Sequence, residues 1–169
     1  MEESTKAEFK RFLSDLRMPS DGKMMSQGQR VAVKDIISIV QMLKYSAENM
    51  SETTVGAVLT RVGRLVALKE LGTHNATKEE LAKSCFRSLS TKGWGLFVTE
   101  PNREGGQVIL KNSAIADEYP TKGLKVDYIA VGMISTIYEK SFGGRYIVKE
   151  VECVAKGDEM CKFTVKPLG

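Results

Sequence analysis

A short segment near the C-terminus places the strongest constraint on the fold. Residues 150–165 read EVECVAKGDEMCKFTV, with two cysteines eight positions apart around a Lys-Gly-Asp turn. Alternating apolar residues on both sides predict a β-hairpin, and Gly157 suits the left-handed position that such turns need. A turn with an odd number of residues would place Cys153 and Cys161 on one face of the sheet, whereas an even number would separate them.

Strict alternation also predicts which side chains share that face. In the first strand, Ile147 and Val151 have the same parity as Cys153, so all three are expected on one side. Glu150 and Glu152 have the opposite parity. A β-bulge would therefore be needed to bring either carboxylate beside the thiols.

Two interpretations of the cysteine pair follow from the residues alone. Buried cysteines pack like small hydrophobic side chains, which is the common role of such a pair. Alternatively, the two thiolates hold a metal, and a structural zinc site takes about four ligands. Carboxylates would then have to complete the set, and Glu150 and Glu152 are the nearest in the sequence.

The rest of the chain predicts an α+β domain. Apolar residues at helical spacing predict helices, and alternating runs between turn residues predict strands. The predicted helices span residues 4–16, 35–50, 52–71, 77–91 and 123–142, and the predicted strands span residues 29–34, 93–100, 107–112, 145–155 and 161–167. Because hairpins dominate, the expected architecture is a twisted antiparallel sheet packed with helices. We expect an N-terminal helix and linker over residues 1–28 and one domain over residues 29–169.

Two local signals refine the helices. Gly56 and Gly63 lie inside a predicted helix, where each glycine costs roughly 1 kcal/mol relative to alanine. Close packing of another backbone is the expected reason. Thr77, with Glu80 three residues later, predicts a capping box at the start of the following helix.

Composition limits the classes of function. The 169 residues carry a net charge of +4 from interspersed charges, which permits nucleic-acid contact without arguing for it. The charged N-terminus contains no signal peptide and no apolar run approaches a membrane span, so we expect a cytoplasmic protein. Thiols stay reduced there, which favours a metal or catalytic role for paired cysteines over a disulfide. No Ser-His-Asp set, acid pair or phosphate loop stands out, so we expect no catalytic residues.

Several segments together resemble the 4-vinyl reductase (4VR) domain family. The hairpin resembles the closing motif of that family, in which an acid, a cysteine, an Ala-x-Gly-Asp turn and a second cysteine recur. Further resemblance covers about residues 29–166 and includes the segments QRVAVKDI, VGAVLTRVGRLVALKELG, GWGLFVTE, NSAIADEY and KVDYIAVGMISTIYEKSFGG. The family implies a dimeric domain that binds small molecules, here an apolar or aromatic one, and that is not usually catalytic.

The resemblance also implies a metal site. Metal-bearing relatives hold zinc with a glutamate, the two hairpin cysteines and a cysteine on the preceding helix. In this chain the corresponding residues are Glu150, Cys153, Cys161 and, in place of the helix cysteine, Asp127. Aspartate can ligate zinc at about 2.0–2.2 Å. The implied site is therefore a structural zinc completed by Asp127 or by water.

The ligand-binding residues are harder to predict than the metal ligands. Trp94, Tyr128 and Met133 are the candidates, although apolar side chains at such positions are commonly part of the core. A second interpretation makes residues 77–113 a recognition helix and wing for DNA. Its basic residues are Lys78, Lys83, Arg87 and Lys92. Interspersed acidic residues weaken the electrostatic footprint that DNA binding requires, so nucleic acid is the less favoured partner.

Overall fold

The computed structural model describes most of the chain. It describes residues 36–74, 76–119 and 126–169, and in the N-terminal part residues 6–7, 10–11, 13–17, 24–26 and 29–31. In that N-terminal part, strand β1 (Met24–Ser26) pairs antiparallel with β2 (Gln29–Val31). The helix predicted over residues 4–16 and the boundary predicted at residue 28 fall on residues that are only partly described, so both remain predictions.

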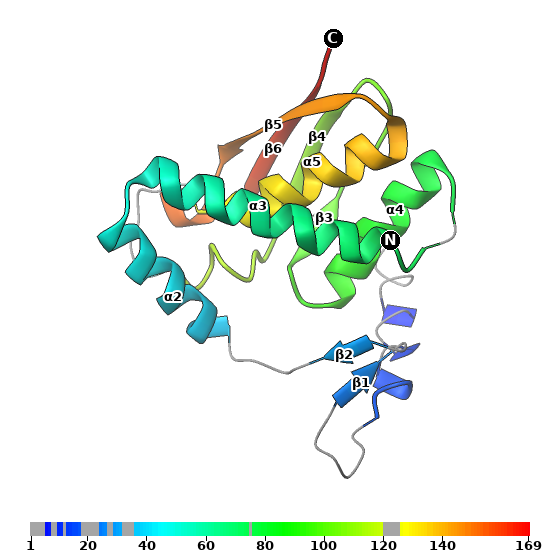
Figure 1. Cartoon of the computed structure of the whole chain (residues 1–169), viewed down its shortest axis with the longest axis horizontal. Helices are drawn as coiled ribbons and strands as arrows, with labels where there is room; N and C mark the ends of the chain where they lie inside the picture. The colour runs from blue at the N-terminus through cyan, green and yellow to red at the C-terminus, as the bar shows by residue number, and fades with distance from the viewer. Residues whose placement is uncertain are drawn as a thin grey trace.

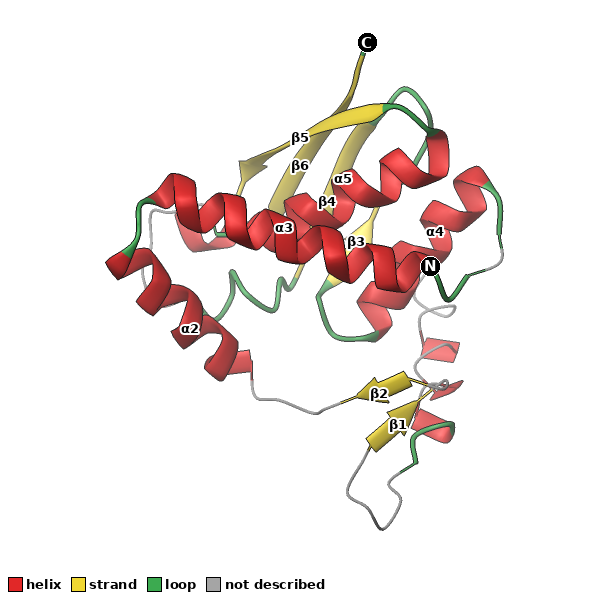
Figure 2. Ribbon diagram, viewed as in Figure 1, coloured by secondary structure: helices red, strands yellow, loops and turns green. Residues whose placement is uncertain are grey.

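Four strands form the main antiparallel sheet, in the order β3-β4-β6-β5 (Figure 1). They are β3 (Leu96–Val98), β4 (Gly106–Lys111), β5 (Arg145–Glu152) and β6 (Cys161–Leu168). All three pairings within this sheet are antiparallel, and the two predicted hairpins are present. The helices lie together against one side of the sheet (Figure 2). The predicted α+β class is therefore confirmed.

Four helices follow the predicted positions closely. They are α2 (Ile36–Asn49), α3 (Glu52–Leu71), α4 (Lys78–Thr91) and α5 (Tyr128–Phe142). The predicted capping box is wrong, because the Thr77 side chain makes no capping hydrogen bond. A side-chain cap occurs at α3 instead, where the Ser51 hydroxyl accepts a hydrogen bond from the Thr54 backbone N–H at 3.2 Å. None of the described helices is long and apolar enough to cross a membrane.

Glycines allow α3 and α5 to cross in close contact in front of the sheet (Figure 1). A Cβ atom at Gly63 would lie 2.8 Å from the carbonyl carbon of Ile129 and closer still to its oxygen. A Cβ atom at Gly132 would likewise lie 2.9 Å from the carbonyl carbon of Thr60. Each glycine thus admits the backbone of the opposite helix. The close packing predicted for Gly63 is confirmed, and it occurs within the chain.

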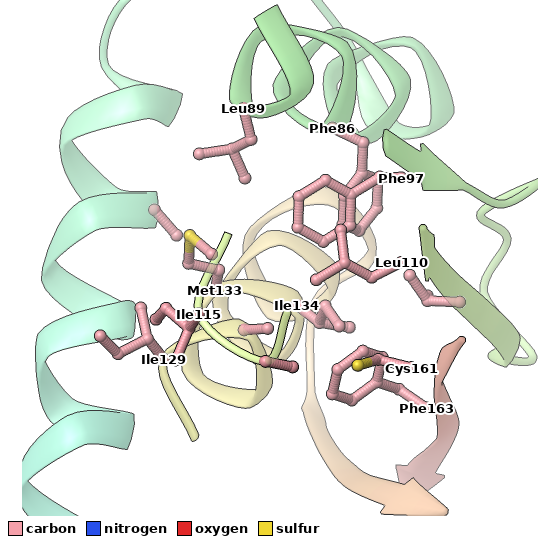
Figure 3. Packing of buried hydrophobic residues seen from close by; sticks show 14 of the residues in the cluster. Phe86, Leu89, Phe97, Leu110, Ile115, Ile129, Met133, Ile134, Cys161 and Phe163 are labelled. Carbon is pink, nitrogen blue, oxygen red and sulfur yellow. The ribbon is translucent and has the colours of Figure 1, made fainter. Parts of the chain in front are cut away.

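The hydrophobic core fills the space between the helices and the inner face of the sheet (Figure 3). Phe86 of α4 and Phe97 of β3 pack with ring centroids 5.4 Å apart. Met133 of α5 is only 1% exposed and lies within this core, whereas Trp94 is partly buried against its edge. Burial of this apolar cluster is the main favourable contribution to folding.

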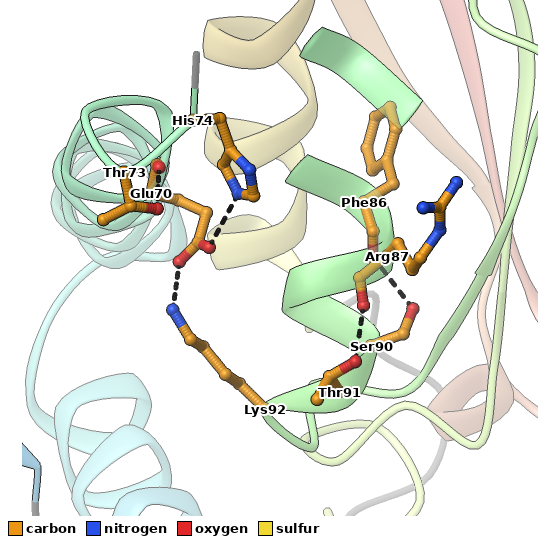
Figure 4. Close-up of polar contacts among 8 residues, drawn as sticks. All are labelled: Glu70, Thr73, His74, Phe86, Arg87, Ser90, Thr91 and Lys92. Carbon is orange, nitrogen blue, oxygen red and sulfur yellow. Dashed lines mark hydrogen bonds and ion pairs between the residues drawn. The ribbon is translucent and has the colours of Figure 1, made fainter. Parts of the chain in front are cut away.

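A buried carboxylate joins the ends of α3 and α4 (Figure 4). Glu70 on α3 is 5% exposed and accepts a hydrogen bond from the Lys92 ammonium at 2.6 Å. His74 also contacts it, with Nε2 3.3 Å from Glu70 Oε1. Burial alone raises the pKa of Glu70, but the hydrogen bonds from His74 and Lys92 outweigh that effect and lower it to about 2. Glu70 is therefore charged at neutral pH and links the two helices.

Candidate functional site

A β-bulge in β5 places an acidic residue on the inner face of the sheet. Glu150 pairs with Phe163, but Glu152 pairs with Lys162, so the register shifts by one residue between them. The bulge that the metal interpretation required is therefore present. The prediction that Ile147 and Val151 share the face of Cys153 is wrong, because both are exposed, at 43% and 40%. Glu150 faces inward instead and is 8% exposed.

The turn after β5 returns the chain so that both cysteines face inward. Residues Val154–Lys156 form a single 3-10 turn, and Gly157 follows with φ +107° in the left-handed region. The Asp158 carboxylate accepts a hydrogen bond from the Cys153 backbone N–H at 2.8 Å, which closes the turn. The sulfur atoms of Cys153 and Cys161 consequently lie 4.0 Å apart, and both residues are fully buried. The prediction that the two thiols share a face is confirmed.

The start of α5 brings a fourth acidic residue to this place. Asp127 immediately precedes α5 and is 2% exposed. Its Oδ1 atom accepts a hydrogen bond from the Ser113 hydroxyl at 2.9 Å, while Oδ2, within reach of Cys161, has no hydrogen bond of normal geometry among the described residues. One ligand atom from each of Asp127, Glu150, Cys153 and Cys161 lies within 4.8 Å of the others. We call these four residues the acid–thiol cluster.

Burial and mutual proximity change the acidity of this cluster. Burial raises the pKa of Asp127 to about 6. Burial, with the nearby charge of Asp127, raises the pKa of Glu150 to about 10. A hydrogen bond from the Cys161 thiol lowers the pKa of Cys153, and the same interaction raises that of Cys161. Without a cation, Glu150 and Cys161 would therefore keep their protons at neutral pH.

The cluster could hold a metal ion. Bonds of about 2.0–2.3 Å at tetrahedral angles separate neighbouring zinc ligands by about 3.3–3.8 Å, so small side-chain shifts would bring the four groups to that spacing. Two further features suit a metal: the Val154 backbone N–H donates to the Cys161 sulfur at 3.4 Å, and the Ser113 hydroxyl orients Asp127. A cation would also compensate four buried acidic groups that otherwise oppose one another's ionisation.

A separate cavity of about 250 Å³ lies beside the cluster. The described residues that line it are mostly apolar and come from α2, α3 and the segment before α5: Leu43, Ala47, Glu52, Val55, Leu59, Tyr119, Val126 and Tyr128. Its main polar feature is a hydrogen bond from the Tyr128 hydroxyl to the Glu52 carboxylate at 2.9 Å. An apolar cavity with few oriented polar groups is the usual form of a small-molecule site.

Of the three ligand-binding residues predicted from sequence, only Tyr128 lines this cavity. Met133 lies in the core and Trp94 packs at its edge, so neither is among the lining residues. The residues that were missed include Val55 and Leu59, which belong to the ordinary apolar stripe of α3. Their spacing marks a buried helix face, but no local signal distinguishes a side chain beside a cavity from one beside another side chain.

Residues 77–113 give little support to the DNA-binding interpretation. Strands β3 and β4 are part of the main sheet, where β4 also pairs with β6. Lys83 lies 3.2 Å from the Glu100 carboxylate, and Lys92 lies 2.6 Å from that of Glu70. Two of the four basic residues on which that interpretation depends are thus paired with acids inside the protein.

Known proteins can now be compared with this geometry. Residues 107–167 match the vinyl-4-reductase (4VR) domain. The match contains β4, α5 and the bulged hairpin, and so all four residues of the acid–thiol cluster. It confirms the 4VR resemblance over this part of the chain. Protein MJ0150 of Methanocaldococcus jannaschii is 21% identical over 169 residues, which span 91% of this chain and 96% of that protein.

Two solved structures share the fold. The phenol-responsive sensory domain of the transcription activator PoxR, solved with phenol, aligns with a TM-score of 0.79 at 14% identity, over 96% of this chain and 90% of that chain. A vinyl-4-reductase family protein from Methanocaldococcus jannaschii aligns with a TM-score of 0.55, also at 14% identity, over 82% of this chain and 85% of that chain. At such identities the likeness establishes the fold of this chain and not its ligand.

Proposed function

We propose that this chain is a binding module for a small apolar or aromatic molecule, with a structural zinc at its C-terminal hairpin. The observation that carries the proposal is the cavity between α2, α3 and the segment before α5. Its volume of about 250 Å³ exceeds the roughly 150 Å³ of an apolar cavity that accepts benzene. A single aromatic ring with small substituents would therefore fit. The phenol-bound sensory domain with the same fold makes phenol a sensible first probe.

Binding would depend on burial of apolar surface. Val55 and Val126 are each 6% exposed and Leu43 is 4% exposed, so these cavity walls are already shielded from water. Transfer of a ring from water into such a site contributes about 25 cal/mol per Å² of buried apolar area. The Tyr128 hydroxyl and the Glu52 carboxylate would provide the polar handle that orients a ligand.

Zinc would be held by Glu150, Cys153, Cys161 and Asp127. If all four ligands come from the protein, the set is closed and has no open coordination position, so its role would be structural. Zinc would join the hairpin, which supplies three ligands, to the start of α5, which supplies the fourth. The mixed set of two sulfur and two oxygen donors is compatible with zinc chemistry.

Isothermal titration of the whole protein with phenol tests the ligand site. Trp94 does not line the cavity, so its fluorescence is not the appropriate signal. Val55→Phe places a larger side chain in the cavity and is expected to weaken phenol binding at least tenfold. The matched control is Val58→Phe on the exposed side of the same helix, where the side chain is 52% exposed, and it should bind like the wild type. Equal affinities in both variants, or no saturable binding of phenol or toluene, would reject the cavity as a binding site.

We also propose a homodimer, on the family resemblance and on one surface feature. Apolar side chains on one side of α3 are 40–55% exposed, namely Val58, Val62, Leu65 and Leu68. A second copy of the chain could cover this surface. Gly56 and Gly63, which also prompted the expectation of a dimer, contact Tyr128 and Ile129 of the same chain. They therefore give no separate support to it.

A further inference from the structure

Three consecutive residues belong to both sites. Val126 and Tyr128 line the cavity, and Asp127 between them is a member of the acid–thiol cluster. Val126 and Asp127 are buried, at 6% and 2% exposure, and α5 begins at Tyr128. This short segment therefore forms one wall of the cavity and, on its other side, one part of the cluster.

The cluster contacts the backbone of this wall as well as the Asp127 side chain. The backbone N–H of Val126 donates a hydrogen bond to the Cys153 sulfur, and that of Asp127 donates to the Glu150 carboxylate. Both acceptors are predicted metal ligands. The position of the wall thus depends on the geometry of the same groups that would bind the metal.

The opposite side of the wall contacts α3 through Tyr128. A Cβ atom at Gly56 would lie 3.0 Å from the Tyr128 ring, so the ring rests directly on the α3 backbone at this glycine. The hydroxyl of the same ring donates to Glu52 on the first turn of α3. A shift of residues 126–128 would therefore change the distance between α3 and the wall, and with it the shape of the cavity.

We propose that metal binding and ligand binding are thermodynamically coupled through residues 126–128. This inference rests on the proposed function, because it requires both sites. The metal fixes Asp127, Glu150 and the two thiolates in one arrangement, which holds the cavity wall in the form that the ligand needs. Metal-loaded protein then binds the apolar ligand more tightly, and the ligand raises the metal affinity by the same factor. Coupling between sites is commonly about 5–150-fold, and we expect about tenfold here.

The experiment measures the affinity for phenol of the whole protein, loaded with zinc and after chelation. The expected dissociation constant is about ten times lower in the zinc-loaded form. Reciprocity supplies a second measurement, in which saturating phenol should raise the zinc affinity by the same factor in competition with a chromophoric chelator. Substitution by Co²⁺ gives a third, because phenol should change the visible spectrum of thiolate-bound cobalt.

Two variants separate coupling from general stabilisation. Val55→Phe, which fills the cavity and leaves the cluster intact, should bind zinc with an affinity that phenol does not change. Cys153→Ser combined with Cys161→Ser should bind phenol like the chelated wild type. If that variant does not fold, the chelated wild type serves as the comparison.

Equal phenol affinity, within twofold, with and without zinc would overturn the coupling and leave the ligand site standing. Phenol binding by a protein that takes up no zinc would overturn it too. A protein that binds zinc but no phenol or toluene would overturn the proposed ligand site, and the coupling with it.

Discussion

The crossing of α3 and α5 leads to a sharp prediction about Gly63. A Cβ atom at this position would lie 2.8 Å from the Ile129 carbonyl carbon and 3.0 Å from the Met133 backbone nitrogen. These are backbone atoms of a buried helix, so no side chain can rotate away to make room. Ordinary van der Waals contact begins near 3.4 Å, and Gly63→Ala must therefore push the helices apart by at least 0.6 Å (3.4 − 2.8).

The magnitude follows from two opposing contributions. Alanine is the better helix former and contributes up to about 1 kcal/mol in favour of the variant. Overpacking of a tight core costs about 1–3 kcal/mol, and contact with rigid backbone places this site at the upper end. We expect a net destabilisation of about 2 kcal/mol for Gly63→Ala. Gly132, whose Cβ would meet Thr60 and Arg64 of α3 in the same way, should behave alike.

Urea unfolding followed by circular dichroism measures this difference, with Gly72→Ala as the matched control. Gly72 follows the same helix with φ −66°, and its Cβ would meet nothing nearer than 3.5 Å. Gly72→Ala should therefore be neutral or stabilising by up to about 1 kcal/mol. If Gly63→Ala proves as stable as Gly72→Ala, the helices do not approach as described and the argument for the crossing fails.

Three further predictions concern other parts of the molecule. Metal analysis of the wild type should find one zinc per chain, and Cys153→Ala with Cys161→Ala should abolish it and lower the melting temperature; a wild-type protein without zinc after gentle purification would leave only a thiol pair. Because the pKa of Glu70 falls from 4.5 to about 2 on folding, its ionisation contributes roughly 3 kcal/mol, present above about pH 4.5 and lost as the pH falls towards 2. Glu70→Gln should thus flatten the acid limb of the stability curve, and an unchanged limb would count against the link to Lys92. Sedimentation at micromolar concentration should detect a dimer that Leu65→Glu disrupts, and a wild-type monomer of 18.7 kDa would contradict it.

Periodicity was sufficient to predict the elements but not the faces of every strand. Helices α2 and α3 have long apolar stripes that only a helix can bury on one side, so their limits agree with the sequence to within one residue or so. Strand β5 has an equally regular pattern, yet the bulge between Glu150 and Glu152 reverses the face after it. A bulge is set by pairing with a neighbouring strand and has no fixed local sequence. The parity argument therefore failed for Ile147 and Val151.

The acid–thiol cluster was predictable because its motif is compact. Three of its members lie within twelve residues of one hairpin, and Gly157 and Asp158 define the turn between the cysteines. The family resemblance supplied Asp127, which lies far from the hairpin in sequence. The cavity was not predictable in this way. Its lining residues come from segments between Leu43 and Tyr128, and their convergence depends on how closely α3 approaches α5.

The cavity and the cluster both depend on where α5 begins. Gly63 and Gly132 let α3 and α5 approach to backbone contact, and this fixes α5 relative to α3. With α5 in that position, the residue before its first turn, Asp127, reaches the hairpin thiols, and its first residue, Tyr128, reaches Glu52 across the mouth of the cavity. Neighbours in sequence thus serve two different sites because the chain passes between them. A sequence pattern shows that both side chains are special, but only the helix crossing shows that they share one wall.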